Sequence, residues 1–201
     1  TDEIGLFLDK VRQDPASTVE AEVFIHGAIC VAWSGQCLTS AVWGARSANR
    51  GECAQDCRMP YDLVVDGQVR PLGELRYLLS PRDLAGAEHI PTLLRHGVAA
   101  IKLEGRQKGA TYVGVTTSGY RRWVRALETD GEAEPAAQQL EEDLRAMATT
   151  YSRGFSEGFL GGANHQSLVE GRFPKHRGLY VGKVERVSAR EVEVVRGRRE
   201  S

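Results

Sequence analysis

The sequence has 201 residues, 41% of them hydrophobic and 26% charged, and its formal net charge is −1. This length and composition are ordinary for a globular chain with one domain and part of a second. Neither a run of eighteen apolar residues nor a signal-peptide pattern is present, so membrane insertion and secretion are not supported, and a cytoplasmic location is expected. Residues 150–201 hold 10 basic and 6 acidic side chains, an excess too small to establish nucleic-acid binding without a motif.

The first segment, TDEIGLFLDKVRQD, has an approximate helical apolar stripe that ends at Asp14-Pro15. Proline disfavours helical geometry in the residue before it, so a helix ending here is predicted. This helix is already under way at the first residue, and the first methionine is Met59. We therefore expect the chain to be a fragment.

A short strand is predicted at residues 21–25, where alternation places Glu22, Phe24 and His26 on one face. A long connection, residues 27–62, follows it and contains every cysteine of the chain.

A second strand is predicted at residues 76–79. Ser80 and Asp83 then have the spacing of a helix cap with an acid at the third helical position, and Pro81 suits the first position. The helix is expected to start there and to end at Gly97.

A third strand is predicted at 98–103 and a third helix at 112–127. Because strands and helices alternate, we expect a parallel sheet with crossover helices. A TIM-type barrel needs eight such units. The fold class predicted for residues 1–127 is therefore α/β, as the C-terminal part of a TIM-type (β/α) barrel whose N-terminal half is missing.

The remainder divides into two parts. Residues 128–150 are acidic and rich in Ala and Gln, and predict a linker followed by a helix. Residues 151–201 are rich in Gly and Arg and end in a predicted hairpin of strands 179–187 and 191–195. This hairpin would begin a small, incomplete β domain.

The four cysteines, Cys30, Cys37, Cys53 and Cys57, are separated by six, fifteen and three residues. If residues 53–57 were helical, the last two sulfurs would share one face. In a cytosolic protein such a cluster indicates metal or redox chemistry more than disulfides. The six-residue gap fits zinc knuckles poorly, but spacing alone leaves an iron–sulfur cluster, zinc and four buried reduced cysteines open.

Three charged residues near the end of the third strand, Lys102, Glu104 and Arg106, would share one face if the strand continued. Active sites of barrels lie at this end of the strands, so all three are candidate catalytic residues. His26 ends its own strand just before the cysteine connection and could bind a metal, hydrogen-bond a sulfur or move protons. Three arginines, Arg46, Arg50 and Arg58, lie among the cysteines. They could attract phosphate or an acidic cosubstrate, or balance thiolate charge.

The stretch EVFIHGAICVAWSGQCLTS, continued by SANRGECAQDCRMPY, resembles the signature of the U32 peptidase family, the collagenase-like proteins. LLSPRDL, HGVAAIKLEGRQKGATYV, YSRGFSEGFLGG and RGLYVGKV resemble later parts of larger members, so the likeness covers about residues 20–187. The segments beyond residue 150 are most similar to members that hydroxylate a cytidine of ribosomal RNA.

This resemblance implies a function. Several family members are implicated in oxygen-independent hydroxylation of a tRNA or rRNA base or of the ubiquinone ring, and such members carry a 4Fe-4S cluster. By motif, the cluster ligands here would be Cys30, Cys37, Cys53 and Cys57, with zinc as the alternative metal. RNA is then the expected substrate, and a small acidic oxygen donor is a candidate cosubstrate.

Two other hypotheses remain. A collagenase-like protease could use a cysteine with His26, although the sequence contains neither an HExxH pair nor a G-x-S-x-G elbow. A non-catalytic metal-binding module could instead bind RNA or a protein partner.

Overall fold

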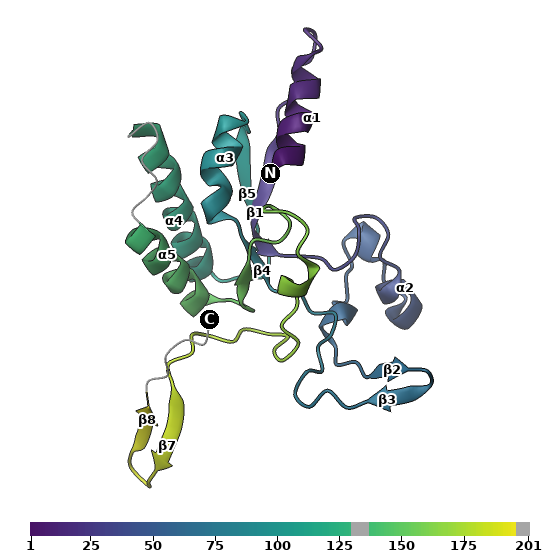
Figure 1. The fold of residues 1–201 in the computed structure, drawn as a ribbon, viewed down its shortest axis with the longest axis vertical. Coiled ribbons are helices and arrows are strands. Elements are labelled where there is room, and N and C mark those ends of the chain that lie inside the picture. The colour runs from purple at the N-terminus through teal and green to yellow at the C-terminus, as the bar shows by residue number, and fades with distance from the viewer. Residues whose placement is uncertain (130–136, 196–201) are drawn as a thin grey trace.

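The computed structural model describes residues 1–129 and 137–195. Its N-terminal elements are α1 (Asp2–Arg12), β1 (Glu22–Ala28), α2 (Thr39–Gly44), β2 (Leu63–Val65), β3 (Gln68–Arg70) and β4 (Asp83–Ala85). They are followed by α3 (Ile90–Arg95), β5 (Ala100–Leu103), α4 (Ala110–Thr129), α5 (Ala137–Thr150), β6 (Phe155–Ser156), β7 (Lys183–Val187) and β8 (Val192–Val195). The strands β5, β1, β4 and β6 form one central sheet, and the hairpins β2–β3 and β7–β8 lie outside it (Figure 1).

The central sheet has four strands in the order β5-β1-β4-β6. β1 runs parallel to β5, and β4 runs parallel to β6, but β1 and β4 are antiparallel. The prediction of parallel strands with crossover helices is thus confirmed for two pairs and wrong for the third. Within the described ranges the sheet is open and closes no barrel, so a TIM-type barrel, in which all strands are parallel, is not confirmed.

The core lies between the sheet and the helices. Ile25 of β1, Leu93 of α3 and Met147 of α5 are fully buried there, and Tyr120 and Trp123 of α4 join them in one cluster. Burial of such large apolar side chains is the main favourable contribution to folding. α4 and α5 lie on one side of the sheet and the cysteine segment on the other (Figure 1).

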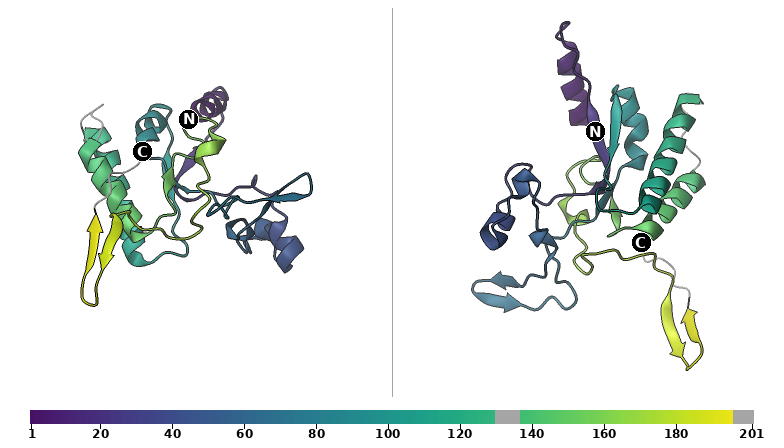
Figure 2. Two further views of the ribbon diagram at one scale, coloured as in Figure 1. Left: turned by 60° about the horizontal axis from the view of Figure 1, so that its bottom comes forward. Right: turned by 180° about the vertical axis from the view of Figure 1, so that it is seen from behind.

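Several predicted elements are confirmed, namely the first helix, the strands at β1 and β5, the helix at α4 and a helix after the acidic linker. Residues 130–136, where that linker was expected, lie outside the described residues. The predicted C-terminal hairpin exists as β7 and β8, which project away from the rest of the chain (Figure 2).

The region around residue 80 was predicted wrongly. Residues 76–79 form no strand, and Asp83 begins strand β4 instead of capping a helix. Pairing with β1 and β6 outweighs the local cap pattern. The helix starts only at Ile90, with Pro91 in its first turn, and ends at Arg95 with His96 as its C-cap. The predicted stop residue Gly97 follows directly after that cap, where φ is 76°.

Candidate functional site

The four cysteines lie in the segment that leaves the end of β1 and returns at the start of β4. This segment is mostly irregular and extends to one side of the sheet, together with α2 and the β2–β3 hairpin (Figures 1 and 2). All four thiols are free, and those of Cys30 and Cys53 are exposed. Residues 53–57 do not form an α-helix: only a three-residue 3-10 turn, Asp56–Arg58, is present, so the condition for a shared helical face is not met.

The thiols nevertheless lie within reach of each other's charge. Burial raises the pKa of Cys57, and the thiolates of Cys30, Cys53 and Cys37 raise it further, while Arg58 lowers it. Such Coulomb effects extend over several ångströms, farther than a metal–sulfur bond of about 2.3 Å. Among the residues in 1–129 and 137–195, no group of three or more His, Cys, Asp or Glu side chains is arranged to hold a metal ion. The cysteine segment therefore places the four thiols in one part of the molecule, but not in an arrangement that would hold a metal ion.

Four free thiols are a donor set that suits an iron–sulfur cluster or zinc. The chemistry of these four side chains therefore fits either metal group. The Cys37 sulfur has one local contact, with the Thr39 hydroxyl at 3.0 Å, and this hydrogen bond lowers the pKa of Cys37.

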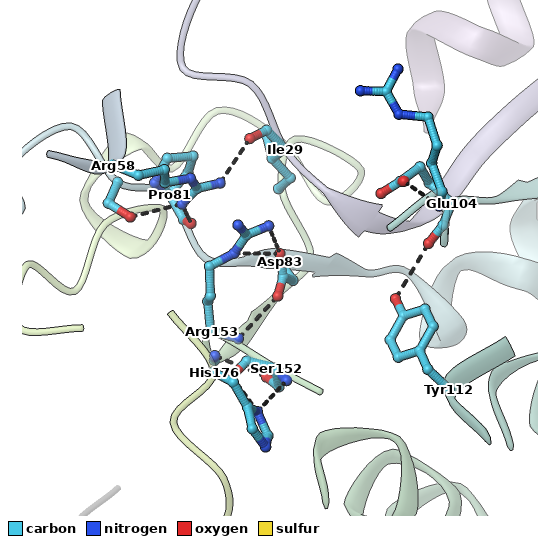
Figure 3. A network of polar contacts seen from close by, with 12 residues as sticks. Ile29, Arg58, Pro81, Asp83, Glu104, Tyr112, Ser152, Arg153 and His176 are labelled. Carbon is cyan, nitrogen blue, oxygen red and sulfur yellow. Dashed lines mark hydrogen bonds and ion pairs between the residues drawn. The ribbon is translucent and has the colours of Figure 1, made fainter. Parts of the chain in front are cut away.

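Two side chains connect the parts of the cysteine segment. The Ser40 hydroxyl, 1% exposed, donates to Asp56 Oδ2 at 2.7 Å and accepts from the Ala54 amide at 3.1 Å. The Arg58 guanidinium donates to the Ile29 carbonyl oxygen at 3.2 Å and also to the Pro81 carbonyl oxygen (Figure 3).

A buried ion pair lies next to this segment. Asp83 of β4 and Arg153, which precedes β6, have side chains only 5% and 7% exposed. The Arg153 side chain donates to Asp83 Oδ1 from Nε at 3.0 Å and from a terminal nitrogen, and the Arg153 amide donates to Oδ2 at 2.9 Å (Figure 3). Asp83 thus has a tertiary partner in place of the expected cap role.

Further basic groups surround this pair. The charges of Arg153 and Asp83 both act on Arg58, whose pKa is lowered mainly by burial and then by Arg153. Lys108 lies over the Tyr151 ring, 3.0 Å from its centroid, and the His176 ring stacks on the same tyrosine. The end of β4 beside the cysteine segment is therefore predominantly basic.

His26 is fully buried on β1. Its Nδ1 lies 3.2 Å from the Tyr120 hydroxyl, and its Nε2 has no hydrogen-bond partner within the described part of the chain. Burial lowers the pKa of His26 to about 4, although the charges of Asp83 and Glu104 act in the opposite direction. The imidazole is therefore neutral near pH 7 and can accept or relay a proton, but it does not carry positive charge.

The three charged residues at the end of β5 lack the strand continuation that the predicted common face required. β5 ends at Leu103, so the alternation needed to align Lys102, Glu104 and Arg106 stops there. Lys102 and Arg106 are exposed, and the Glu104 carboxylate accepts a hydrogen bond from the Arg106 amide at 2.8 Å. Of the three, Glu104 lies nearest the site, because its amide donates to the His26 carbonyl oxygen at 2.9 Å.

Ser40 and Arg153 were not predicted as site residues. A serine three residues after a cysteine gives no distinct signal in one sequence. Arg153 lies in YSRGFSEGFLGG, two residues before Phe155, where β6 begins. This position was the only sign in the sequence that Arg153 could belong to the site. Its partner could be identified only once Asp83 was placed in a strand.

No helix among the described residues is long and apolar enough to cross a membrane.

The chain was compared with known proteins. The model of "Peptidase family U32" matches residues 6–170. The chain is 38% identical over 94% of its length to a 23S rRNA 5-hydroxycytidine synthase of Escherichia coli (strain K12), of which it covers 29%. It is 39% identical over 68% of its length to a tRNA hydroxylation protein of Bacillus subtilis (strain 168), of which it covers 35%. A "Collagenase" of Porphyromonas gingivalis is 36% identical over 70% of the chain, which covers 38% of that protein.

The chain thus spans between a quarter and a half of the length of these curated relatives. No solved structure shows significant similarity to it.

Proposed function

The chain belongs to peptidase family U32, and from this premise we propose that it serves in oxygen-independent hydroxylation of an RNA base, with an iron–sulfur cluster on its four cysteines. Relatives named for rRNA and tRNA hydroxylation support the RNA substrate. We further propose ribosomal RNA as the substrate class and the cytoplasm as the location. Any acidic oxygen-donor cosubstrate belongs to this proposal as well.

The observation that carries the proposal is that all four cysteines, each with a free thiol, lie in the single segment between β1 and β4. A hydrolase that uses one cysteine nucleophile needs one activated thiol and leaves the other three without a role. Cys30, Cys37, Cys53 and Cys57 would hold the cluster, which supplies one-electron chemistry when bound.

The chain's own residues would do the remaining work. His26 is neutral near pH 7, and its Nε2 has no partner among the described residues, so it would act through a hydrogen bond of the neutral ring, because burial disfavours the imidazolium. Glu104, bonded through its amide to the same residue, is the proton-carrying group. Lys102 and Arg106, both exposed, can attract the phosphates of RNA at the surface.

An acidic cosubstrate would be held by the basic groups near β4. Lys108, which lies half-buried over the Tyr151 ring, is the cation available for this, because the Arg58 guanidinium already donates to Ile29, Ser80 and Pro81. Desolvation strengthens its attraction to a carboxylate relative to an exposed lysine.

Iron and acid-labile sulfide analysis of anaerobically purified chain tests the cluster. Wild-type protein is expected to contain both elements, and Cys57→Ser to contain much less of each. Stoichiometric zinc without sulfide would contradict the cluster and favour a zinc-binding module.

The RNA substrate is tested by mass spectrometry of nucleosides from a strain lacking the gene and from its parent. One hydroxylated nucleoside should disappear and return on complementation. Identical nucleoside profiles would contradict RNA hydroxylation.

Peptidase activity is the second candidate, because the relative from Porphyromonas gingivalis is named a collagenase. Among the described residues the His26 ring has no cysteine partner, because its Nδ1 contacts Tyr120 and its Nε2 has no hydrogen-bond partner. Gelatin cleavage by metal-free wild-type chain, abolished in a single cysteine variant, would support this candidate over the first.

A further inference from the structure

The cysteines lie on three separate pieces of chain. Cys30 follows β1, Cys37 precedes α2, and Cys53 and Cys57 flank a short irregular stretch. Fixing the ends of such long, irregular connections costs conformational entropy that grows with their length. Something other than regular secondary structure must therefore hold the pieces together before a metal or cluster binds.

Ser40 joins the second piece to the third. Its buried hydroxyl donates to the carboxylate of Asp56 and accepts from the amide of Ala54. Ala54 is the neighbour of Cys53, and Asp56 is the neighbour of Cys57. One hydroxyl, three residues after Cys37, thus fixes the chain beside both later cysteines.

Arg58 joins the third piece to the first and to the sheet. It directly follows Cys57 and donates to the carbonyl oxygen of Ile29, the neighbour of Cys30. The same guanidinium donates to the Ser80 hydroxyl at 2.8 Å and to the Pro81 carbonyl oxygen, just before β4. Three acceptors on two segments match the several donors of a guanidinium, which a lysine cannot replace.

We propose that Ser40 and Arg58 are positioning residues that hold the four thiols near one another in the metal-free chain. This inference rests on the thiolate site of the proposed function, but it holds for any metal that four thiolates bind. Loss of either side chain leaves buried hydrogen-bonding partners unsatisfied and releases one cysteine piece from the others.

Titration of the reduced, metal-free chain with Co²⁺ tests this inference. Cobalt bound by thiolates absorbs in the visible region, so the spectrum reports both affinity and the number of thiolate ligands. Ser40→Ala and Arg58→Lys are expected to weaken Co²⁺ binding about 10- to 100-fold, the usual cost of losing a group that orients metal ligands. Arg58→Lys keeps the positive charge and therefore separates positioning from charge balance.

Ser34→Ala and Arg50→Lys are the matched controls. Both residues are exposed in the same segment, and within the described residues neither side chain makes a hydrogen bond. They should bind Co²⁺ as the wild type does. Circular dichroism of each metal-free variant shows whether the helices are intact, and if Ser40→Ala does not fold, Arg58→Lys decides the question.

Wild-type affinity in both Ser40→Ala and Arg58→Lys would overturn the inference, as would a wild-type chain that binds Co²⁺ with fewer than three thiolates. The proposed function fails separately, if anaerobically purified wild-type chain contains no sulfide while the cobalt results are as expected.

Discussion

The Asp83–Arg153 pair allows a quantitative test of how β4 and β6 are held together. Asp83→Asn keeps the shape of the side chain but leaves the Arg153 guanidinium, 7% exposed, without its counter-charge. Breaking a buried ion pair from one side costs about 3–5 kcal/mol. For a chain of this size, about 2–4 °C of melting temperature is lost per kcal/mol, so a decrease of about 6–20 °C is expected.

The assay is thermal unfolding followed by circular dichroism, with urea unfolding for the free energies and Asp9→Asn as the control. Asp9 pairs with Arg12 on the surface of α1, where the two side chains are 67% and 51% exposed, and exposed pairs contribute about 0.2–1 kcal/mol. The double variant Asp83→Leu/Arg153→Met removes both charges and should recover much of the loss. If the free energy of unfolding of Asp83→Asn lies within about 1 kcal/mol of that of Asp9→Asn, then Arg153 does not depend on the charge of Asp83.

Three further predictions follow from other residues. The pKa of His26 is about 4 in the folded chain and about 6.5 in the unfolded chain. The folded chain is therefore most stable above pH 6.5, and about 3 kcal/mol of its free energy of unfolding is lost as the pH falls toward 4. Unfolding of wild type and His26→Gln at several pH values should show a steeper loss of stability in acid for the wild type. Gly27→Ala should cost about 1–3 kcal/mol, since φ is 134° and the added carbon would lie 2.8 Å from the Glu104 Cβ; an unchanged urea midpoint would refute this. Leu93→Ala, at a fully buried position, should cost about 2–5 kcal/mol, and a loss below 1 kcal/mol would show that the site refills.

Local patterns predicted the regular elements that depend on local chemistry. The amphipathic stripe before Asp14-Pro15 gives α1, and the Gly97 stop gives the end of α3. The C-terminal hairpin was predicted from two β-rich runs around Ser188, whose hydroxyl and amide both bond to Glu191.

The elements that depend on distant partners were not predictable. Asp83 has the spacing of a helix cap, but its partner Arg153 is seventy positions away in the sequence, and no local pattern reports that pairing. The predicted continuation of β5 to Arg106 failed because β5 ends at Leu103. The cysteines were identified as a set from composition and spacing. The contacts of Ser40 and Arg58 between the parts of the cysteine segment join residues 14 to 29 positions apart, and no local pattern reports them.

The antiparallel pairing of β1 with β4 affects how the protein assembles. Ala28 at the end of β1 lies opposite Asp83 at the start of β4, so the cysteine segment leaves the sheet and re-enters it at adjacent positions. The segment can therefore lengthen, shorten or rearrange without disturbing the register of the strands that bracket it. The pairing of β1 with β4 uses only the backbone groups of the two strands, and the thiols lie outside it.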